Sequence, residues 1–338
     1  MMVAMMKVSV NTRSFSDEDL KFIKQIGVDW VDTGPMLGTE RQAGIASPQE
    51  GTLDLKKVSE GIKKIRAANL NISTVRGTSI QQALMGKPEG EKELEDICNF
   101  IKVLGEESIP VMHLGLETRS PRSVPGRVDK AHRGGYLMGA FSLDLMRREI
   151  VKRDMNSPWA YHFRDKITFD EYFHNCVKIL ERVIPIAEDS EVKLMFHADD
   201  PPVEVESLIP GITNSLLIRR LFEAVPSKNI GLQFCCGARY ESGENIYDLI
   251  RLFGKENKIF HVHLRNVRGT IPSVGGYEEV AIDDGDINIF KVLQTLKEVG
   301  YGGTINPDHF PTLIGDNVGR ASLAFSIGYI KALLSIVE

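Results

Sequence analysis

The sequence predicts a parallel (β/α)8 barrel of the TIM type, on three observations. Short apolar runs of strand length alternate with longer amphipathic stretches, and eight of each occur in strict order. Eight parallel strands, each followed by a helix, is the number that closes into a barrel. No low-complexity linker divides the chain, so we expect a single domain over residues 1–338. A doubly wound open sheet is the competing arrangement.

The helix signals agree with this alternation. The amphipathic stretches carry apolar residues at three- and four-residue spacing, as a one-sided helix requires. Ser16 precedes two acidic residues where the free amides of the first helix need acceptors and favour negative charge. Gly27 and Gly300 stand where the first and seventh helices must end. The expected strands are 6–11, 28–33, 70–75, 109–114, 192–197, 230–235, 259–264 and 304–309, and the expected helices are 17–27, 55–69, 91–105, 169–189, 214–225, 245–254, 287–300 and 317–337.

One long segment interrupts the alternation. Residues 115–167 follow the fourth strand, and a loop of that length in a compact domain is usually functional. Within it, SLDLMRREIVKR (142–153) could form a helix. We expect an insertion that forms a partly helical lid over the barrel mouth, and a peripheral or dimer-contact insertion is the alternative.

Composition and charge exclude several classes of protein. The formal net charge is −5 and the isoelectric point is about 6.0, which argues against a nucleic-acid partner. The apolar runs are of strand length, so no membrane span is expected, and the start of the chain lacks the features of a secretory signal. Four cysteines are too few for a disulfide framework. We expect a cytoplasmic homo-oligomer, a dimer, that acts on a small molecule.

The last four strands each end in a residue that can bind a metal. In a barrel the carboxyl ends of the strands meet at one mouth, where the following loops build the active site. The helices between these strands are poor in His and Cys. A mixture of thiolate, carboxylate and imidazole suits a divalent transition metal and leaves room for water or substrate. The residues are His197 after the fifth strand, Cys235 on the sixth, His263 on the seventh and Asp308 on the eighth.

Neighbouring residues compete for these roles. Cys236 follows Cys235, and a strand cysteine is often a small buried apolar residue, but we favour Cys235 as the donor. Residues two apart on a strand share a face, so His261 could lie one layer below His263, or outward if a bulge intervenes. His113 ends the fourth strand and could line the same mouth. A structural role is the alternative for each histidine, because a histidine at a strand end is usually hydrogen-bonded within the protein.

The eighth strand ends in two candidate groups, Asp308 and His309. Adjacent residues of a regular strand point to opposite sides, so both cannot face the interior of the barrel. Pro307 precedes them, and a strand that is finished there would let both turn toward the mouth.

Four motifs in this half of the chain resemble one known family. HADDPP (197–202), LQFCCG (232–237), VHLRN (262–266) and PDH (307–309) are similar to mannonate dehydratases, within the xylose-isomerase-like barrel superfamily. The resemblance covers the chain from about Phe169 onward.

The resemblance implies a chemistry and a set of site residues. It implies a divalent metal, manganese before iron, cobalt or zinc, held by His197, Cys235, His263 and Asp308. It implies that His309 is an acid/base residue beside the metal. The implied substrate is an acyclic sugar acid, which loses water to give a 2-keto-3-deoxy sugar acid.

The chain departs from the family near the C-terminus. The family places a Tyr, the second acid/base group, before an Asp-Arg-Ala segment, whereas this chain has Val318 and Gly319 there. Valine cannot move protons. Either Tyr240, Tyr277, His113 or a residue of the insertion replaces that Tyr, or the reaction differs.

Three polar residues are expected to bind the substrate. Arg265 lies just beyond a metal-ligand candidate, and its planar guanidinium matches the two oxygens of a carboxylate, although a salt bridge at the rim is the alternative. Asn266 and Arg320 are the further candidates. The leading hypothesis is a hydro-lyase of carbohydrate metabolism that dehydrates a D-mannonate-like acid. The alternatives are a metal-dependent sugar isomerase or epimerase of the same superfamily, and a barrel that binds metal and sugar without turnover.

Overall fold

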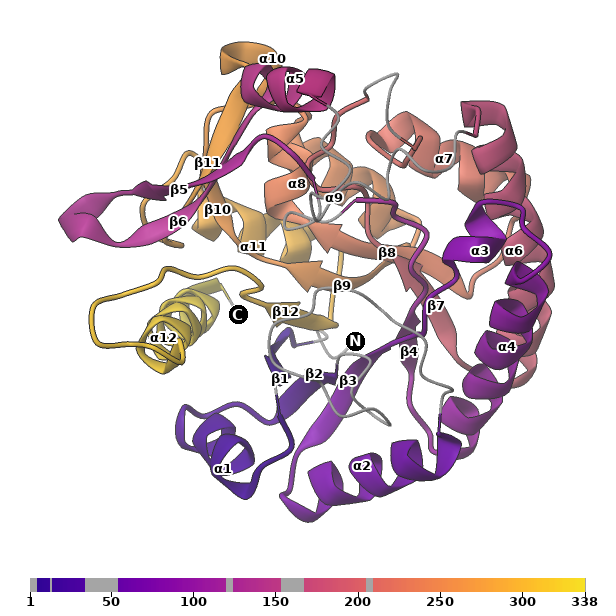
Figure 1. Cartoon of the computed structure of the whole chain (residues 1–338). Coiled ribbons are helices and arrows are strands. Elements are labelled where there is room, and N and C mark those ends of the chain that lie inside the picture. Colours follow the sequence, from indigo (N-terminus) through magenta and orange to yellow (C-terminus); the bar gives the residue numbers. More distant parts are fainter. Residues whose placement is uncertain are drawn as a thin grey trace.

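The computed structural model describes residues 5–12, 14–33, 54–119, 124–152, 167–204 and 209–337. Within these residues eight parallel strands close into the predicted barrel (Figure 1), which excludes the open doubly wound sheet. The chain passes once around the barrel, and the last strand closes on the first. In the order of hydrogen-bonded neighbours the strands are β1 (Lys7–Thr12), β12 (Thr304–Asn306), β9 (Ile259–His263), β8 (Ile230–Cys235), β7 (Lys193–Phe196), β4 (Val111–His113), β3 (Asn71–Arg76) and β2 (Trp30–Thr33).

All eight predicted barrel helices form, and they surround the strands (Figure 1). The Ser16 side chain accepts a hydrogen bond from the Asp19 amide (3.1 Å), so the predicted first cap is confirmed. Gly27 and Gly300 both have φ of 72°, a conformation that favours glycine and ends a helix. The helices are α1 (Asp17–Gln25), α2 (Leu55–Ala67), α4 (Gly90–Glu106), α6 (Phe169–Asp189), α7 (Ser215–Ala224), α9 (Ile246–Lys255), α11 (Ile289–Glu298) and α12 (Arg320–Val337).

A second, four-stranded antiparallel sheet was not predicted. It takes β5 (Arg127–Ala131) and β6 (Leu137–Ser142) from the insertion and β10 (Asn266–Arg268) and β11 (Gly276–Val280) from the connection after β9. Figure 1 shows this sheet beside the barrel, with the magenta strands of the insertion against the orange β10 and β11. The short helices α3 (Gln81–Leu84), α8 (Cys236–Glu241) and α10 (Ile271–Val274) were also missed.

The insertion contains the helix that the sequence suggested, α5 (Leu143–Lys152). Residues 120–123 and 153–166 of the insertion lie outside the described part of the chain. A lid over the mouth remains a prediction. The described part of the insertion pairs with β11 through β6, so it is joined to the loop that follows a barrel strand.

The last helix, α12, is more apolar than expected. By length and composition alone it could cross a membrane, so the expectation that apolar runs are only of strand length is wrong here. One such helix is weak evidence for a span, because a helix of a soluble core meets the same criterion. Here α12 contacts β1 and α11, and Ile327, Ile330 and Leu334 are among its buried residues.

A buried ion pair fixes the start of the insertion to the end of β7. The Asp199 carboxylate accepts hydrogen bonds from the Thr118 and Arg119 amides (2.8 and 2.9 Å) and from Arg119 Nη1 (3.2 Å). Both side chains of the pair are almost fully buried. Gly211 leaves room for the carboxylate, because a Cβ there would lie 1.5 Å from Asp199 Oδ2. Asp199 is therefore a structural residue.

We expect Asp199→Ala to lower the free energy of unfolding by about 3–5 kcal/mol, because it leaves the buried Arg119 charge without its partner. Urea unfolding followed by circular dichroism measures the loss. Asp129→Ala is the matched control, since Asp129 is exposed on β5 and its replacement should cost less than about 0.5 kcal/mol. Equal midpoints for the two variants would contradict the anchoring role of Asp199.

Candidate metal centre and active site

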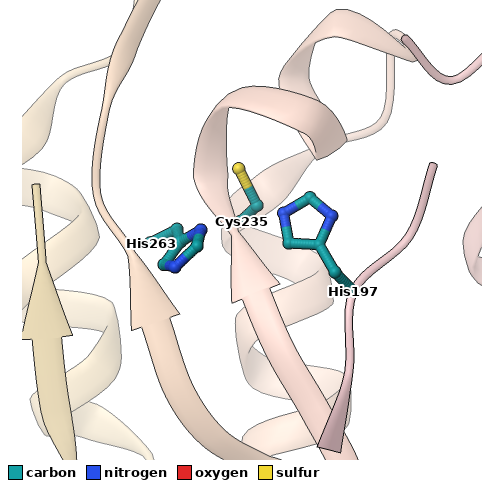
Figure 2. Close-up of side chains that lie close together, drawn as sticks. All are labelled: His197, Cys235 and His263. Atoms are coloured by element: carbon teal, nitrogen blue, oxygen red, sulfur yellow. The ribbon is translucent and has the colours of Figure 1, made fainter. Parts of the chain in front are cut away.

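Three of the predicted donors meet at the mouth of the barrel. His197 follows the last residue of β7, while Cys235 and His263 are the last residues of β8 and β9. Cys235 and His263 are direct partners in the β8–β9 register. The potential ligand atoms of the three side chains all lie within 4.8 Å of one another, and Figure 2 shows the three side chains directed toward one another.

Asp308 lies beside them as the fourth candidate donor. Strand β12 ends at Asn306, so Asp308 and His309 are free of strand alternation, as the position of Pro307 suggested. Asp308 Oδ2 lies 3.2 Å from His263 Nδ1. Asp308 Oδ1 and His263 Nδ1 are both buried and have no hydrogen-bond partner among the described residues. Such unsatisfied atoms are costly unless a cation or another group engages them.

One ring nitrogen of His197 and one of His263 already have partners within the protein. These partners determine which nitrogen of each ring is free. His197 Nδ1 contacts the carbonyl oxygen of Ala198. His263 Nε2 lies 2.5 Å from Gln233 Nε2, and when the Gln233 amide is turned to present its oxygen, His263 Nε2 donates to it. This leaves Nε2 of His197 and Nδ1 of His263 available for a metal. Metal-binding histidines are usually held in this way through their second nitrogen. One thiol, two imidazoles and one carboxylate therefore fit a divalent transition metal.

The two adjacent cysteines differ in their electrostatic surroundings. Burial alone would raise the pKa of the Cys235 thiol, but the Arg265 guanidinium and the neighbouring His197 and His263 rings hold that pKa well below its ordinary value. Cys235 also caps α8, and its sulfur accepts from the Ala238 amide (3.4 Å). Burial and the neighbouring Cys235 instead raise the pKa of Cys236 well above the ordinary value. Cys235 is the residue that can supply a thiolate.

Arg265 is not at the rim. It is only 1% exposed, and its two terminal nitrogens contact Asp200 and Glu241. Glu279 Oε1 and Asp308 Oδ2 each lie 3.6 Å from the guanidinium. Asp200, Glu241 and Glu279 form a second carboxylate cluster with metal-like spacing, but the guanidinium already supplies a positive charge there. These contacts favour a positioning role for Arg265 over the expected contact with the substrate.

The two other expected substrate-binding residues are also engaged within the protein. The Asn266 amide nitrogen donates to the carbonyls of Ile282 and Ile287 (2.9 and 3.1 Å), and its oxygen accepts from the Ile287 amide (3.0 Å). Asn266 therefore shapes the loop before α11. Arg320 begins α12 and pairs with Glu18 and Asp19 of α1 (2.6 and 2.9 Å).

His309 lies beside Asp308, as His263 does. Its Nδ1 donates to Glu279 Oε1 (2.9 Å), while its Nε2 lies 3.6 Å from Asp308 Oδ2. Burial lowers the pKa of His309, but Glu279 and Asp308 outweigh burial and raise the pKa above its ordinary value.

His261 lies below the four donors, in the deeper layer that alternation allowed. It is fully buried, and its ring centroid is 5.4 Å from that of His263. Its Nδ1 is 2.8 Å from Thr304 Oγ1, and its Nε2 is 3.5 Å from Asp32 Oδ2. Asp32 in turn accepts from Ser9 Oγ (2.6 Å). His261 belongs to a polar layer inside the barrel.

Comparisons with known proteins agree with this arrangement. The sequence pattern of the D-mannonate dehydratase (UxuA) family matches residues 156–338, which is more than half of the chain. The mannonate dehydratase of Thermotoga neapolitana is 32% identical over 241 residues, covering 69% of this chain and 64% of the relative. The chain belongs to the D-mannonate dehydratase family.

Further members of the family match most of the chain. The mannonate dehydratase of Thermotoga petrophila is 27% identical over 317 residues, covering 84% of this chain and 86% of the relative. The crystal structure of the mannonate dehydratase from Streptococcus suis serotype 2 superposes with a TM-score of 0.79 at 22% identity, covering 99% of this chain and 94% of that one. That likeness supports the barrel fold.

The structure also places the residues considered as replacements for the family's Tyr. Val318 is 65% exposed in the turn before α12. Tyr240 lines a surface pocket with Glu244 and Pro272. Tyr277 is buried, donates to Asp200 Oδ1 (2.8 Å) and accepts from Arg127 Nη1 (3.0 Å). Burial raises the pKa of Tyr277 well above the ordinary value, so this phenol stays protonated.

His113 remains a candidate for a group at the mouth. It is the last residue of β4 and is 4% exposed, and its Nε2 lies 3.4 Å from Glu117 Oε1. Its Nδ1 has no hydrogen-bond partner among the described residues. Burial and the nearby Arg76 and His197 hold the pKa of His113 well below its ordinary value, so the imidazole is neutral.

Several site residues were missed by sequence reasoning. Glu279 and Arg127 lie on the second sheet, which was not predicted, and Gln233 lies two residues before Cys235 on β8. Gln233 could have been found, because alternation places it on the same face as Cys235. Glu279 and Arg127 have no comparable signal, since their strands were expected to be loop.

We expect Cys235→Ser to weaken binding of a divalent transition metal at least about tenfold, because a hydroxyl replaces a thiolate donor. Cys236→Ser is the matched control, and it should keep near-native affinity because burial and the neighbouring Cys235 keep the Cys236 thiol protonated. Titration of metal-free protein with Mn²⁺ or Co²⁺, followed by calorimetry or by the cobalt absorption spectrum, measures both. A larger loss in Cys236→Ser would reverse the assignment.

Proposed function

We propose that this chain is a metal-dependent hydro-lyase that converts an acyclic sugar acid of the D-mannonate type into a 2-keto-3-deoxy sugar acid. Membership of the D-mannonate dehydratase family supports a sugar-acid dehydratase. The observation that carries the proposal is the meeting of two imidazoles, a thiol and a carboxylate at one barrel mouth, with a further imidazole beside them.

We infer that His197, Cys235, His263 and Asp308 hold the metal. Manganese is the first candidate, and iron, cobalt or zinc are the others, because availability as well as affinity decides which ion occupies such a site. A divalent cation bound there would polarise substrate oxygens and stabilise the negative charge that develops beside the carboxylate.

His309 is the proposed acid/base residue. Dehydration removes a proton from the carbon beside the carboxylate and expels the hydroxyl of the next carbon as water. The proton taken in the first step can be returned to the departing hydroxyl, so one imidazole can serve both steps. In the neutral ring, Nδ1 carries the proton that it donates to Glu279, and Nε2 keeps a lone pair on the side of Asp308. This pairing suits Nε2 for the transfer.

We also propose that the enzyme acts in the cytoplasm as a homodimer. All four cysteines are free, which suits a reducing compartment. Size-exclusion chromatography with light scattering distinguishes a dimer from a monomer.

The substrate is tested with metal-loaded protein and a panel of aldonic acids and aldoses. We expect formation of a 2-keto-3-deoxy acid from D-mannonate or a close relative, measured by a colorimetric assay for such acids. Interconversion of aldoses without this product would instead identify an isomerase or epimerase, which family membership does not favour. Bound sugar acid without turnover, seen by calorimetry, would identify a non-catalytic barrel.

We expect His309→Asn to lower kcat by about a hundredfold or more, which is the usual contribution of a general acid/base, while the bound metal stays near the wild-type level. Turnover assays and elemental analysis of the same sample measure the two quantities. His174→Asn is the matched control, because His174 is exposed on α6. Full activity in His309→Asn would exclude the assigned role.

A further inference from the structure

The second sheet contacts His309, the proposed acid/base residue, through the carboxylate of Glu279 on β11. Its Oε1 accepts from His309 Nδ1 (2.9 Å) and lies 3.0 Å from Arg127 Nη2 of the inserted strand β5. The residue is 5% exposed, so its charge is removed from bulk water and depends on these partners. Arg127 also donates to Tyr277, which in turn donates to Asp200.

We propose that Glu279 is a positioning residue that fixes the tautomer of His309, and that Arg127 of the insertion holds Glu279 in place. The inference rests on the proposed function for the part that concerns turnover. A neutral imidazole carries one proton, and an acceptor at one nitrogen selects the tautomer that donates to it. Glu279 accepts at Nδ1, so the lone pair is left on Nε2, which is 3.6 Å from Asp308 Oδ2.

A glycine in the insertion makes the contact possible. Gly139 lies on β6, between β5 and β11 in the sheet. A Cβ at this position would lie 2.4 Å from Arg127 Nη2 and 3.0 Å from Glu279 Oε2. A side chain there would therefore push the two charged groups apart. The backbone of Gly139 and the side chain of Arg127 both come from the inserted hairpin. The insertion therefore contributes to the contacts that orient His309.

The decisive measurement is the tautomer of His309 in metal-free protein. Long-range ¹H–¹⁵N correlation of protein with ¹⁵N-labelled histidine distinguishes the two tautomers of the neutral ring. The His309 signals are those missing from His309→Asn. We expect the Nδ1–H tautomer in the native chain and a shift toward the Nε2–H tautomer in Glu279→Ala. The Nε2–H tautomer in the native chain, or an unchanged tautomer in Glu279→Ala, would overturn the proposal.

Kinetics give a second readout. We expect Glu279→Ala to lower kcat about 10- to 100-fold, in the range typical for loss of a residue that orients a site group, with KM nearly unchanged. Glu279→Gln keeps an oxygen acceptor and should restore part of kcat. Glu278→Ala is the matched control, because Glu278 precedes Glu279 in the chain and its carboxylate pairs with the exposed Lys130. Equal kcat in Glu279→Ala and Glu278→Ala would refute the role in turnover.

Two features keep the test decisive. If Glu279→Ala does not fold because Arg127 loses its partner, Gly139→Ala disturbs the same contact while both charges remain, and it should shift the tautomer in the same direction. If the native chain dehydrates no sugar acid, the proposed function fails, but the tautomer still decides whether Glu279 orients His309. A native tautomer in a folded Gly139→Ala would show that the inserted hairpin does not hold Glu279.

Discussion

The buried guanidinium of Arg265 contacts most of the segments that build the site. Arg265 is only 1% exposed and lies among carboxylates that come from four segments: the end of β7, α8, β11 and the end of β12. Removing a single partner from a buried ion pair costs about 3–5 kcal/mol. Separating any of these segments from Arg265 therefore carries a large free-energy cost. The same positive charge lowers the pKa of Cys235, which favours the thiolate form that a metal donor requires.

This arrangement divides the site into two parts with different origins. His197, Cys235, His263 and Asp308 follow or end barrel strands, and closure of the barrel brings them together. Glu279 comes from a sheet that is built half from the insertion and half from the connection after β9. Arg265 contacts both parts, so their relative position depends on a close fit around it. Gly237 shows how close that fit is, because a Cβ there would lie 2.5 Å from the guanidinium carbon.

The sequence was sufficient to predict the barrel and the meeting of His197, Cys235 and His263 at its mouth, because both depend on local periodicity and on the rule that strand ends share one mouth. The second sheet was not predictable in this way. Strand β5 is almost entirely exposed, so it lacks the apolar run that marks a barrel strand. The role of Arg265 was also hidden. Its partners Asp200, Glu241 and Glu279 are far apart in the sequence, and only the folded chain shows that they surround it.

The two sheets obey different connection rules, and this explains how the insertion could join the site. Parallel barrel strands need helical crossovers, so their order cannot change without rebuilding the barrel. Antiparallel strands need only short turns, so the loop after β9 and the insertion can pair at the mouth while the barrel stays closed. The candidate metal donors lie at the ends of barrel strands, and the carboxylate that contacts His309 lies on the second sheet. In this architecture the surroundings of His309 include the second sheet as well as the barrel, and Arg265 links the two by contacting both Glu279 and Asp308.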